Sequence, residues 1–104
     1  SSGTKIKPYA KVSLDKKGKL LTAESSGDGP VDACFKALDK ITGQKVKLED
    51  FRLEAVTSGK DALGQVSLKL NTRGSTVSGR GSSTDIVEAA VKAYIDAVNK
   101  LENK

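Results

Sequence analysis

The alternation of apolar and polar residues near the start of the chain predicts a β-hairpin. Residues 9–15 alternate alanine, valine and leucine with polar side chains, as a strand buried on one face does. Lys16-Lys17-Gly18 supplies a turn, and residues 19–24 are predicted to return as the second strand.

Two apolar stripes with helical spacing indicate two amphipathic helices. The first begins at Pro30, which suits an initial helical position because its missing N–H would be unpaired there, and ends at Gly43. The second begins near Asp85, which with Glu88 three residues later resembles a capping box. The stripes consist of Val31, Cys34, Phe35, Leu38 and Ile41 in the first helix and of Val87, Ala90, Val91, Tyr94, Val98 and Leu101 in the second.

The segment that follows the first helix reads as a long strand over residues 46–56. Phe51, Leu53 and Ala55 alternate onto one face of it. Leu48 falls out of that alternation, so we expect a bulge or a late strand start there.

A second hairpin is predicted before the last helix. Residues 57–64 are polar and contain glycine, which indicates a loop. Residues 66–70 then alternate as a strand, Arg73-Gly74 turns the chain, and residues 75–80 return.

An internal repeat relates the two halves of the chain. Adding 56 to a number in the first half superposes Leu14 on Leu70, Gly18 on Gly74 and Val31 on Val87 without a gap. The long strand of the second half has no counterpart after Ser1, so we expect the chain to begin inside its first unit. The pattern predicts an α+β fold of two strand–strand–strand–helix units, the first lacking its leading strand, with antiparallel sheet and helices on one side. Residues 1–44 and 45–104 are the two units of a single predicted domain.

The missing strand has a predicted consequence for assembly. An unpaired strand edge and an uncovered apolar surface call for a partner, and a homodimer is the simplest answer.

Composition and charge limit the function classes. With 104 residues, 37% hydrophobic content and two Tyr and two Phe as the only aromatics, we expect a modest aliphatic core. The net charge of +5 includes lysines crowded between Lys5 and Lys19, which would permit nucleic-acid binding. The scarcity of aromatics for base stacking favours a solvated edge instead, and a basic RNA-binding module is kept as an alternative.

The residues needed for catalysis or metal binding are sparse. The sequence has no histidine, and its single cysteine, Cys34, lies in a helical apolar stripe, so we predict no catalytic residues, no metal site and no cofactor. One cysteine excludes an internal disulfide and agrees with a reducing, cytoplasmic compartment. No apolar run reaches the length of a membrane span.

The turn before the first helix, read as GDGPVDA over residues 27–33, is the main candidate for chemistry. Free amide groups and the positive end of the helix dipole meet there, which suits a small anion such as a carboxylate. Asp28 in the same turn suits a cation, so a free amino acid would satisfy both. The alternative is that the glycine–proline turn merely begins the helix.

Three segments resemble the C-terminal regulatory domain of 2-isopropylmalate synthases and the related citramalate synthases. They are GDGPVDACFKALDKITG at 27–43, LEAVTSGKDALGQVSLKL at 53–70 and VSGRGSSTDIVEAAVKAYIDAVNKL at 77–101, in the family's order. The resemblance implies that this domain binds leucine, or isoleucine in some citramalate synthases, for feedback inhibition. It also implies pairing about a two-fold and attachment to a catalytic TIM barrel that condenses acetyl-CoA with a 2-oxo acid.

The resemblance also implies which residues contact the effector. The turn is expected to hold the charged head group, and apolar side chains of the long strand are expected to wall an aliphatic slot. Carried over position by position, the contacts fall on Gly27, Asp28, Gly29, Val31, Asp32, Leu48, Phe51, Ala55, Asp61, Ala62, Gly64 and Ser82.

Overall fold

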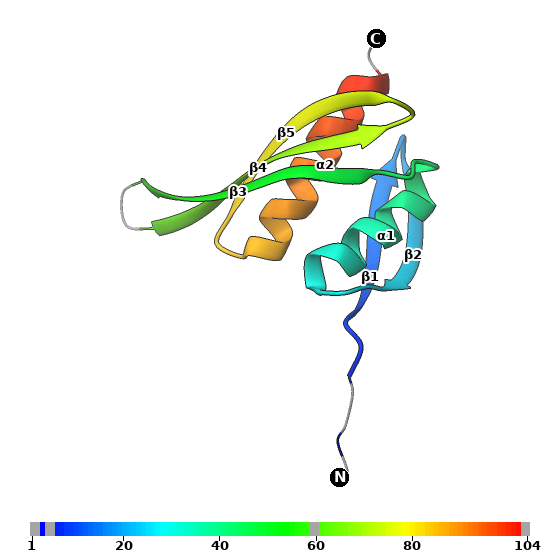
Figure 1. Ribbon diagram of the computed structural model, residues 1–104, viewed down its shortest axis with the longest axis horizontal. Coiled ribbons are helices and arrows are strands. Elements are labelled where there is room, and N and C mark those ends of the chain that lie inside the picture. The colour runs from blue at the N-terminus through cyan, green and yellow to red at the C-terminus, as the bar shows by residue number, and fades with distance from the viewer. Residues whose placement is uncertain (1–2, 4–5, 59–60, 103–104) are drawn as a thin grey trace. The chain divides into compact units, whose positions relative to one another are not determined.

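The computed structural model describes residues 3, 6–58 and 61–102, which form five strands and two helices (Figure 1). The chain divides into two compact units, residues 1–44 and 45–104. Each unit has its own antiparallel sheet and one helix, as the α+β prediction requires. The strands are β1 (Tyr9–Lys16), β2 (Lys19–Ser26), β3 (Lys47–Ser58), β4 (Asp61–Thr72) and β5 (Ser75–Ser83), and the helices are α1 (Pro30–Thr42) and α2 (Ile86–Glu102).

The first unit is a β1–β2 hairpin with α1 packed on one face. Val12 pairs with Ala23 and Leu14 with Leu21, so the alternating apolar residues share the face beneath the helix. The predicted end of α1 is confirmed: Gly43 adopts a left-handed φ of 74°, and its amide donates to the Asp39 carbonyl.

The second unit repeats this plan with one more strand, in the order β3-β4-β5. The turns correspond closely: Lys17 and Gly18 have φ of 52° and 82°, and Arg73 and Gly74 have φ of 52° and 78°. Positive φ at both central residues matches the right-handed twist of the hairpin strands. Among the described residues, β1 has no neighbour in the place that β3 takes beside β4.

The predicted loop at residues 57–64 is wrong. β3 continues to Ser58 and β4 begins at Asp61, so Ala62 and Gly64 lie on a strand. The polar composition misled the prediction because the end of this hairpin projects beyond its helix, where strand residues need no apolar side chains. Figure 1 shows the hairpin extending away from α2.

Two glycines of β5 let α2 approach the sheet very closely. A Cβ on Gly79 would lie 2.7 Å from the Ala97 amide nitrogen and would clash with the Ala93 carbonyl, and one on Gly81 would lie 2.6 Å from the Ala93 nitrogen. The helix surface there consists of alanines that are fully buried. This packing displaces part of the predicted stripe: Val87, Val91 and Leu101 are half-buried, while the core takes Ala89, Ala93 and Ala97.

The free edge of β5 is covered by a row of α2 side chains. Lys92 donates to the Ser82 carbonyl at 3.2 Å, and Lys100 donates to the Ser78 carbonyl at 2.7 Å. Between them the Asp96 carboxylate accepts the Arg80 amide at 2.9 Å. Spacing of four residues puts the row on one helix face, so it occupies backbone groups that could otherwise pair with a strand.

Replacing Gly79 with alanine should destabilise the second unit. The new methyl group would overlap the α2 backbone, and overpacking of this kind costs about 1–3 kcal/mol or more. Gly64→Ala is the matched control, because its Cβ would meet only ordinary contacts, 3.6 Å or more away. Equilibrium urea unfolding followed by circular dichroism measures both, and equal stabilities for the two variants would contradict the close approach.

Candidate functional site

The predicted site residues fall into two groups, one in each unit. The first group surrounds the start of α1 and consists of Gly27, Asp28, Gly29, Val31 and Asp32. The second group lies on the strands of the second unit and consists of Leu48, Phe51, Ala55, Asp61, Ala62, Gly64 and Ser82.

Gly27 is required by the packing of its own unit. It is buried, its amide donates to the Pro8 carbonyl at 3.0 Å, and a Cβ on it would lie 2.5 Å from the Ala33 nitrogen. The backbone that approaches Gly27 is therefore the first turn of α1. This packing explains why residue 27 is glycine, and no ligand is needed for the explanation. A contact of Gly27 with an effector stays a prediction.

Gly29 leaves the first turn of α1 open. It is the N-cap residue and has an extended backbone (φ −158°, ψ 176°). Among the described residues, no side chain forms a capping hydrogen bond at this position. A Cβ at Gly29 would meet nothing within 4 Å. The amides beyond Pro30 therefore face a position where a small ligand has room.

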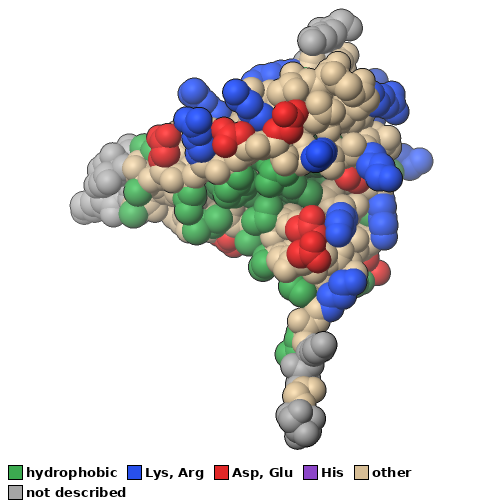
Figure 2. Space-filling model, in the orientation of Figure 1, with side chains coloured by type: hydrophobic (Ala, Val, Ile, Leu, Met, Phe, Trp, Pro, Cys, Tyr) green, Lys and Arg blue, Asp and Glu red, His purple; other side chains and the backbone are tan. Residues whose placement is uncertain are grey.

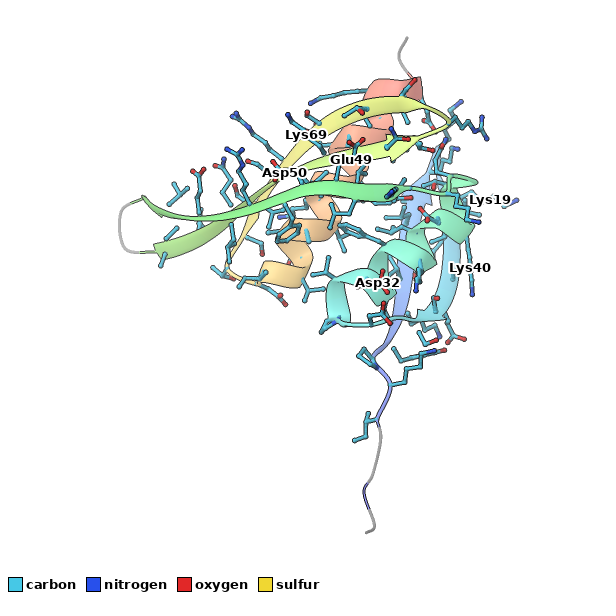
Figure 3. The ribbon with its side chains drawn as sticks, viewed as in Figure 1. Lys19, Asp32, Lys40, Glu49, Asp50 and Lys69 are labelled. Atoms are coloured by element: carbon cyan, nitrogen blue, oxygen red, sulfur yellow. The ribbon has the colours of Figure 1, made fainter. Side chains whose placement is uncertain are left out.

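Asp32 fixes the turn from inside the helix. Its carboxylate accepts the Asp28 amide at 2.8 Å and pairs with Lys36 at 3.0 Å (Figure 3 shows Asp32 in the first turn of α1). The hydrogen bond from the Asp28 amide, and then the bond and charge of Lys36, lower the pKa of Asp32 below 3.8. The backbone of Asp28 is thus held while its own side chain remains exposed.

The second helix begins differently. Asp85 Oδ1 accepts the Val87 amide at 2.8 Å and the Glu88 amide at 3.5 Å, so a side chain occupies the place that is open in α1. The Asp85 amide donates to Ser83 Oγ at 3.1 Å, and Glu88 pairs with Lys92. The predicted cap at Asp85 is confirmed, although Ser83 rather than Glu88 accepts the amide of the capping residue.

A bulge in β3 brings Leu48 and Phe51 onto the same face. Leu48 pairs with Leu70 and Phe51 pairs with Leu68, with the register shift between Leu48 and Asp50. Directly paired residues share a face in an antiparallel ladder, so the extra residue restores Leu48 to the apolar side. The expected bulge is confirmed.

This apolar side of β3 is only partly covered within its unit. Among the described residues α2 contacts β4 and β5 but not β3. Leu53 is 49% exposed and Ile86, at the start of α2, is 46% exposed. Gly64 lies between them, because a Cβ on it would meet Leu53 at 3.6 Å and Ile86 at 3.9 Å. Figure 2 shows hydrophobic side chains gathered along β3, next to charged ones.

Ala55, Ala62 and Gly64 belong to this face, whereas Ser82 does not. Gly64 pairs with Ser83, so Ser82 points to the opposite, polar side of β5. Asp61 begins β4, and its side chain lies outside the described residues. Leu53 and Ile86 were not predicted for the site. The period-two alternation pointed to Leu53, but nothing local in the sequence distinguishes it from a core residue.

Two kinds of feature are absent from the described part of the chain. No group of three or more His, Cys, Asp or Glu side chains there could hold a metal ion. None of its helices is long and apolar enough to cross a membrane.

Comparison with known proteins places these observations in a family. Residues 1–102 match the family described as the LeuA allosteric (dimerisation) domain. The chain belongs to this family. It is 54% identical over 102 residues to 2-isopropylmalate synthase of Carboxydothermus hydrogenoformans, and 53% identical over 102 residues to that of Pelotomaculum thermopropionicum. Each alignment covers 97% of this chain, which spans only 20% of each of these relatives.

The pH dependence of stability should reveal the hydrogen bond to Asp32. Because folding lowers the pKa of this carboxyl, its contribution is present above about pH 4 and is lost as the pH falls through the folded-state value. Asp32→Asn should therefore flatten the loss of stability on acidification. Asp28→Asn removes the same charge but keeps the backbone donor, so it should preserve the slope. Thermal unfolding between pH 2 and 6 measures this, and identical slopes for wild type and Asp32→Asn would contradict it.

Proposed function

We propose that this chain is the regulatory domain of a 2-isopropylmalate synthase and binds leucine as a feedback inhibitor at the start of α1. The observation that carries the proposal is the uncapped first turn of α1, which contrasts with the Asp85 cap of α2. The names of the relatives and the allosteric description of the family support it.

The start of α1 offers chemistry for the head group of an amino acid. The amides of the open first turn and the positive end of the helix dipole suit the effector carboxylate. The exposed Asp28 carboxylate suits the ammonium group, and the bond from its amide to Asp32 keeps its backbone in place.

The apolar face of β3 is proposed, by itself, as a surface that could contact an aliphatic group. Leu48, Phe51 and Ala55 present branched, aromatic and small groups on one strand face that α2 leaves uncovered. Apolar groups of this kind stabilise a bound leucine by burial. This face and the α1 start lie in different units, and the leucine-binding substitutions below test the α1 start.

Feedback inhibition is proposed at the level of the whole enzyme. The chain corresponds to about a fifth of its relatives' length, so the proposed acetyl-CoA-dependent condensation belongs to a catalytic domain outside this sequence. Leucine would then act by a difference in affinity between active and inactive states, with no chemical step in this domain.

Substitutions in the turn should weaken leucine binding measured by calorimetry. Asp28→Asn keeps the shape but removes a charge-assisted contact worth about 1.5–3 kcal/mol, so affinity should fall about tenfold or more. Gly29→Asp should weaken it further, because it sets a carboxylate against that of leucine in space that is now open.

Asp85→Asn is the matched control for these variants. It removes the same charge at the start of the other helix, where asparagine remains a good N-cap, so it should change stability little and spare leucine affinity per folded molecule. If Asp85→Asn and Asp28→Asn weakened leucine binding equally, the site would not lie at α1. Tighter binding of isoleucine than of leucine would instead favour a citramalate synthase regulatory domain.

We also propose that the chain forms a homodimer, in keeping with the dimerisation described for its family. The exposed apolar side chains of β3 and Ile86 are candidates for the interface. Leu53→Lys should weaken self-association in sedimentation equilibrium, whereas Leu20→Lys, at a 70% exposed position on the hairpin of the other unit, should not. A wild-type monomer at high micromolar concentration would contradict the proposal.

A further inference from the structure

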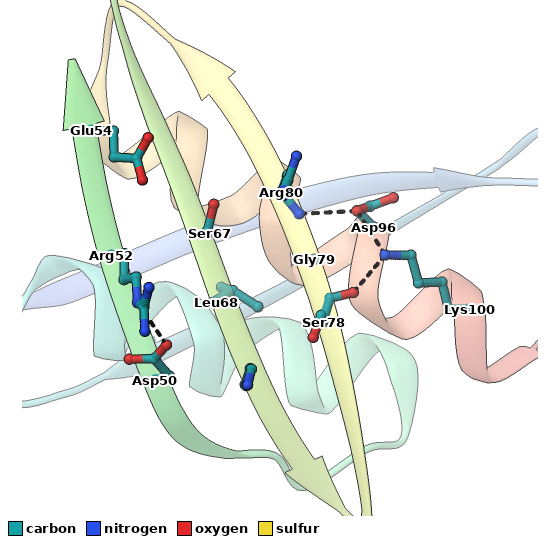
Figure 4. A pocket seen from close by; sticks show the side chains of 11 residues that line it. Asp50, Arg52, Glu54, Ser67, Leu68, Ser78, Gly79, Arg80, Asp96 and Lys100 are labelled. Carbon is teal, nitrogen blue, oxygen red and sulfur yellow. Dashed lines mark hydrogen bonds and ion pairs between the residues drawn. The ribbon is translucent and has the colours of Figure 1, made fainter. Parts of the chain in front are cut away.

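The polar face of the β3-β4-β5 sheet carries a hollow that the proposed effector function does not use. Its volume is about 560 Å³, within the range typical of small-molecule sites. It opens on the side of the sheet opposite to Phe51 and Leu53, because Arg52 pairs with Ser67 and alternates with both. Figure 4 shows the side chains that line it.

A serine hydroxyl lies at the centre of this face with cationic side chains around it. Ser67 on β4 pairs with Arg52 on one side and with Arg80 on the other. Strand spacing puts these two arginines about 10 Å apart at Cα, one on each side of the hydroxyl. Lys69, the next residue of β4 on this face, pairs with Asp50 and Ser78.

The charges in the hollow are unevenly compensated. Asp50 pairs with Arg52 at 3.1 Å, and Asp96 is committed to Lys100 at 3.5 Å and to the Arg80 amide. Within the described part of the chain no ion pair is formed by Lys69, by the Arg80 guanidinium or by Glu54. Two neighbouring cations without an acidic partner therefore lie on one sheet face, and Glu54 is the remaining acid in the lining.

The repeat shows that this arrangement is particular to the second unit. The pair equivalent to Ser67 and Arg80 is Lys11 opposite Glu24, a cation facing an acid. The pair equivalent to Lys69 and Ser78 is Ser13 and Thr22, whose hydroxyls are hydrogen-bonded at 2.8 Å. The first unit thus places one cation opposite one acid at this position, whereas the lining of the hollow in the second unit has four cationic and three acidic side chains.

We propose that this hollow binds the phosphate group of a small molecule. An oxyanion would take hydrogen bonds from the Ser67 hydroxyl and the Arg80 guanidinium fork, with Lys69 as a point charge and Arg52 on the far side. A hollow of this size leaves room for more of the molecule than the phosphate group. The site is independent of leucine, because its side chains lie on the opposite face of the sheet from Leu48, Phe51 and Ala55.

The test is an amide NMR titration of the 104-residue chain with pyrophosphate and inorganic phosphate at constant ionic strength. The expected result is saturable shifts concentrated at Ser67, Lys69 and Arg80, and smaller shifts with acetate. Shifts spread over the lysines of both units, or equal shifts with acetate, would overturn the proposal.

Charge variants distinguish a site from general attraction to a basic protein. Lys69→Gln should weaken pyrophosphate binding about two- to fivefold, the range for an exposed charge pair, and Glu54→Gln should strengthen it by a similar factor. Lys11→Gln makes the same charge change on the polar face of the first unit and should leave the affinity unchanged. An equal loss in Lys69→Gln and Lys11→Gln would overturn the proposal.

A leucine titration of the same variants separates the two proposals. Lys69→Gln should bind leucine as the wild type does, since the phosphate site does not depend on the effector site. Weaker pyrophosphate binding with unchanged leucine binding is expected, whereas a parallel weakening of both would contradict a separate site. All the changed side chains are exposed, and the dispersion of the amide spectrum verifies that each variant is folded.

Discussion

The close packing of small residues between each helix and its sheet is the constraint on which both units depend. Gly79 and Gly81 admit the α2 backbone against β5, and Gly27 admits the first turn of α1 against the end of β2. A single methyl group at any of these positions would overlap backbone, which cannot move aside as a flexible side chain can. These contacts fix the position of each helix start relative to the strand that precedes it.

The same plan then serves different ends in the two units. At α2 the Asp85 carboxylate accepts an amide of the first turn, and helix side chains bind backbone groups along the edge of β5. These backbone groups therefore already have hydrogen-bond partners. At α1 the N-cap is glycine, and the first-turn acid Asp32 accepts the Asp28 amide instead of capping the helix. The two equivalent helices therefore differ at their N-terminal first turns, which is where a helix binds an anion.

Much of this was predictable from local patterns, and the failures have a physical cause. Alternation, helical spacing and the turn glycines predicted every element and the bulge at Leu48, because these depend on residues near in sequence. The loop prediction at 57–64 failed because strand pairing, not composition, decides where a hairpin ends. The predicted site divides similarly: the turn residues are neighbours in sequence, whereas the separation of Ser82 from Ala55 depends on register across three strands. The roles of Gly79 and of the polar hollow also needed coordinates, since glycine at alternate strand positions signals only that something approaches closely.

The central claim is that the open first turn of α1 receives an amino-acid head group. The most direct measurement is an amide NMR titration with leucine that compares the two helix starts. The account predicts saturable shifts at Gly29, Val31 and Asp32, and little change at Val87 and Glu88, whose amides Asp85 already binds. Saturable leucine binding that moved the α2 start and left the α1 start unchanged, or no binding at millimolar leucine, would contradict it.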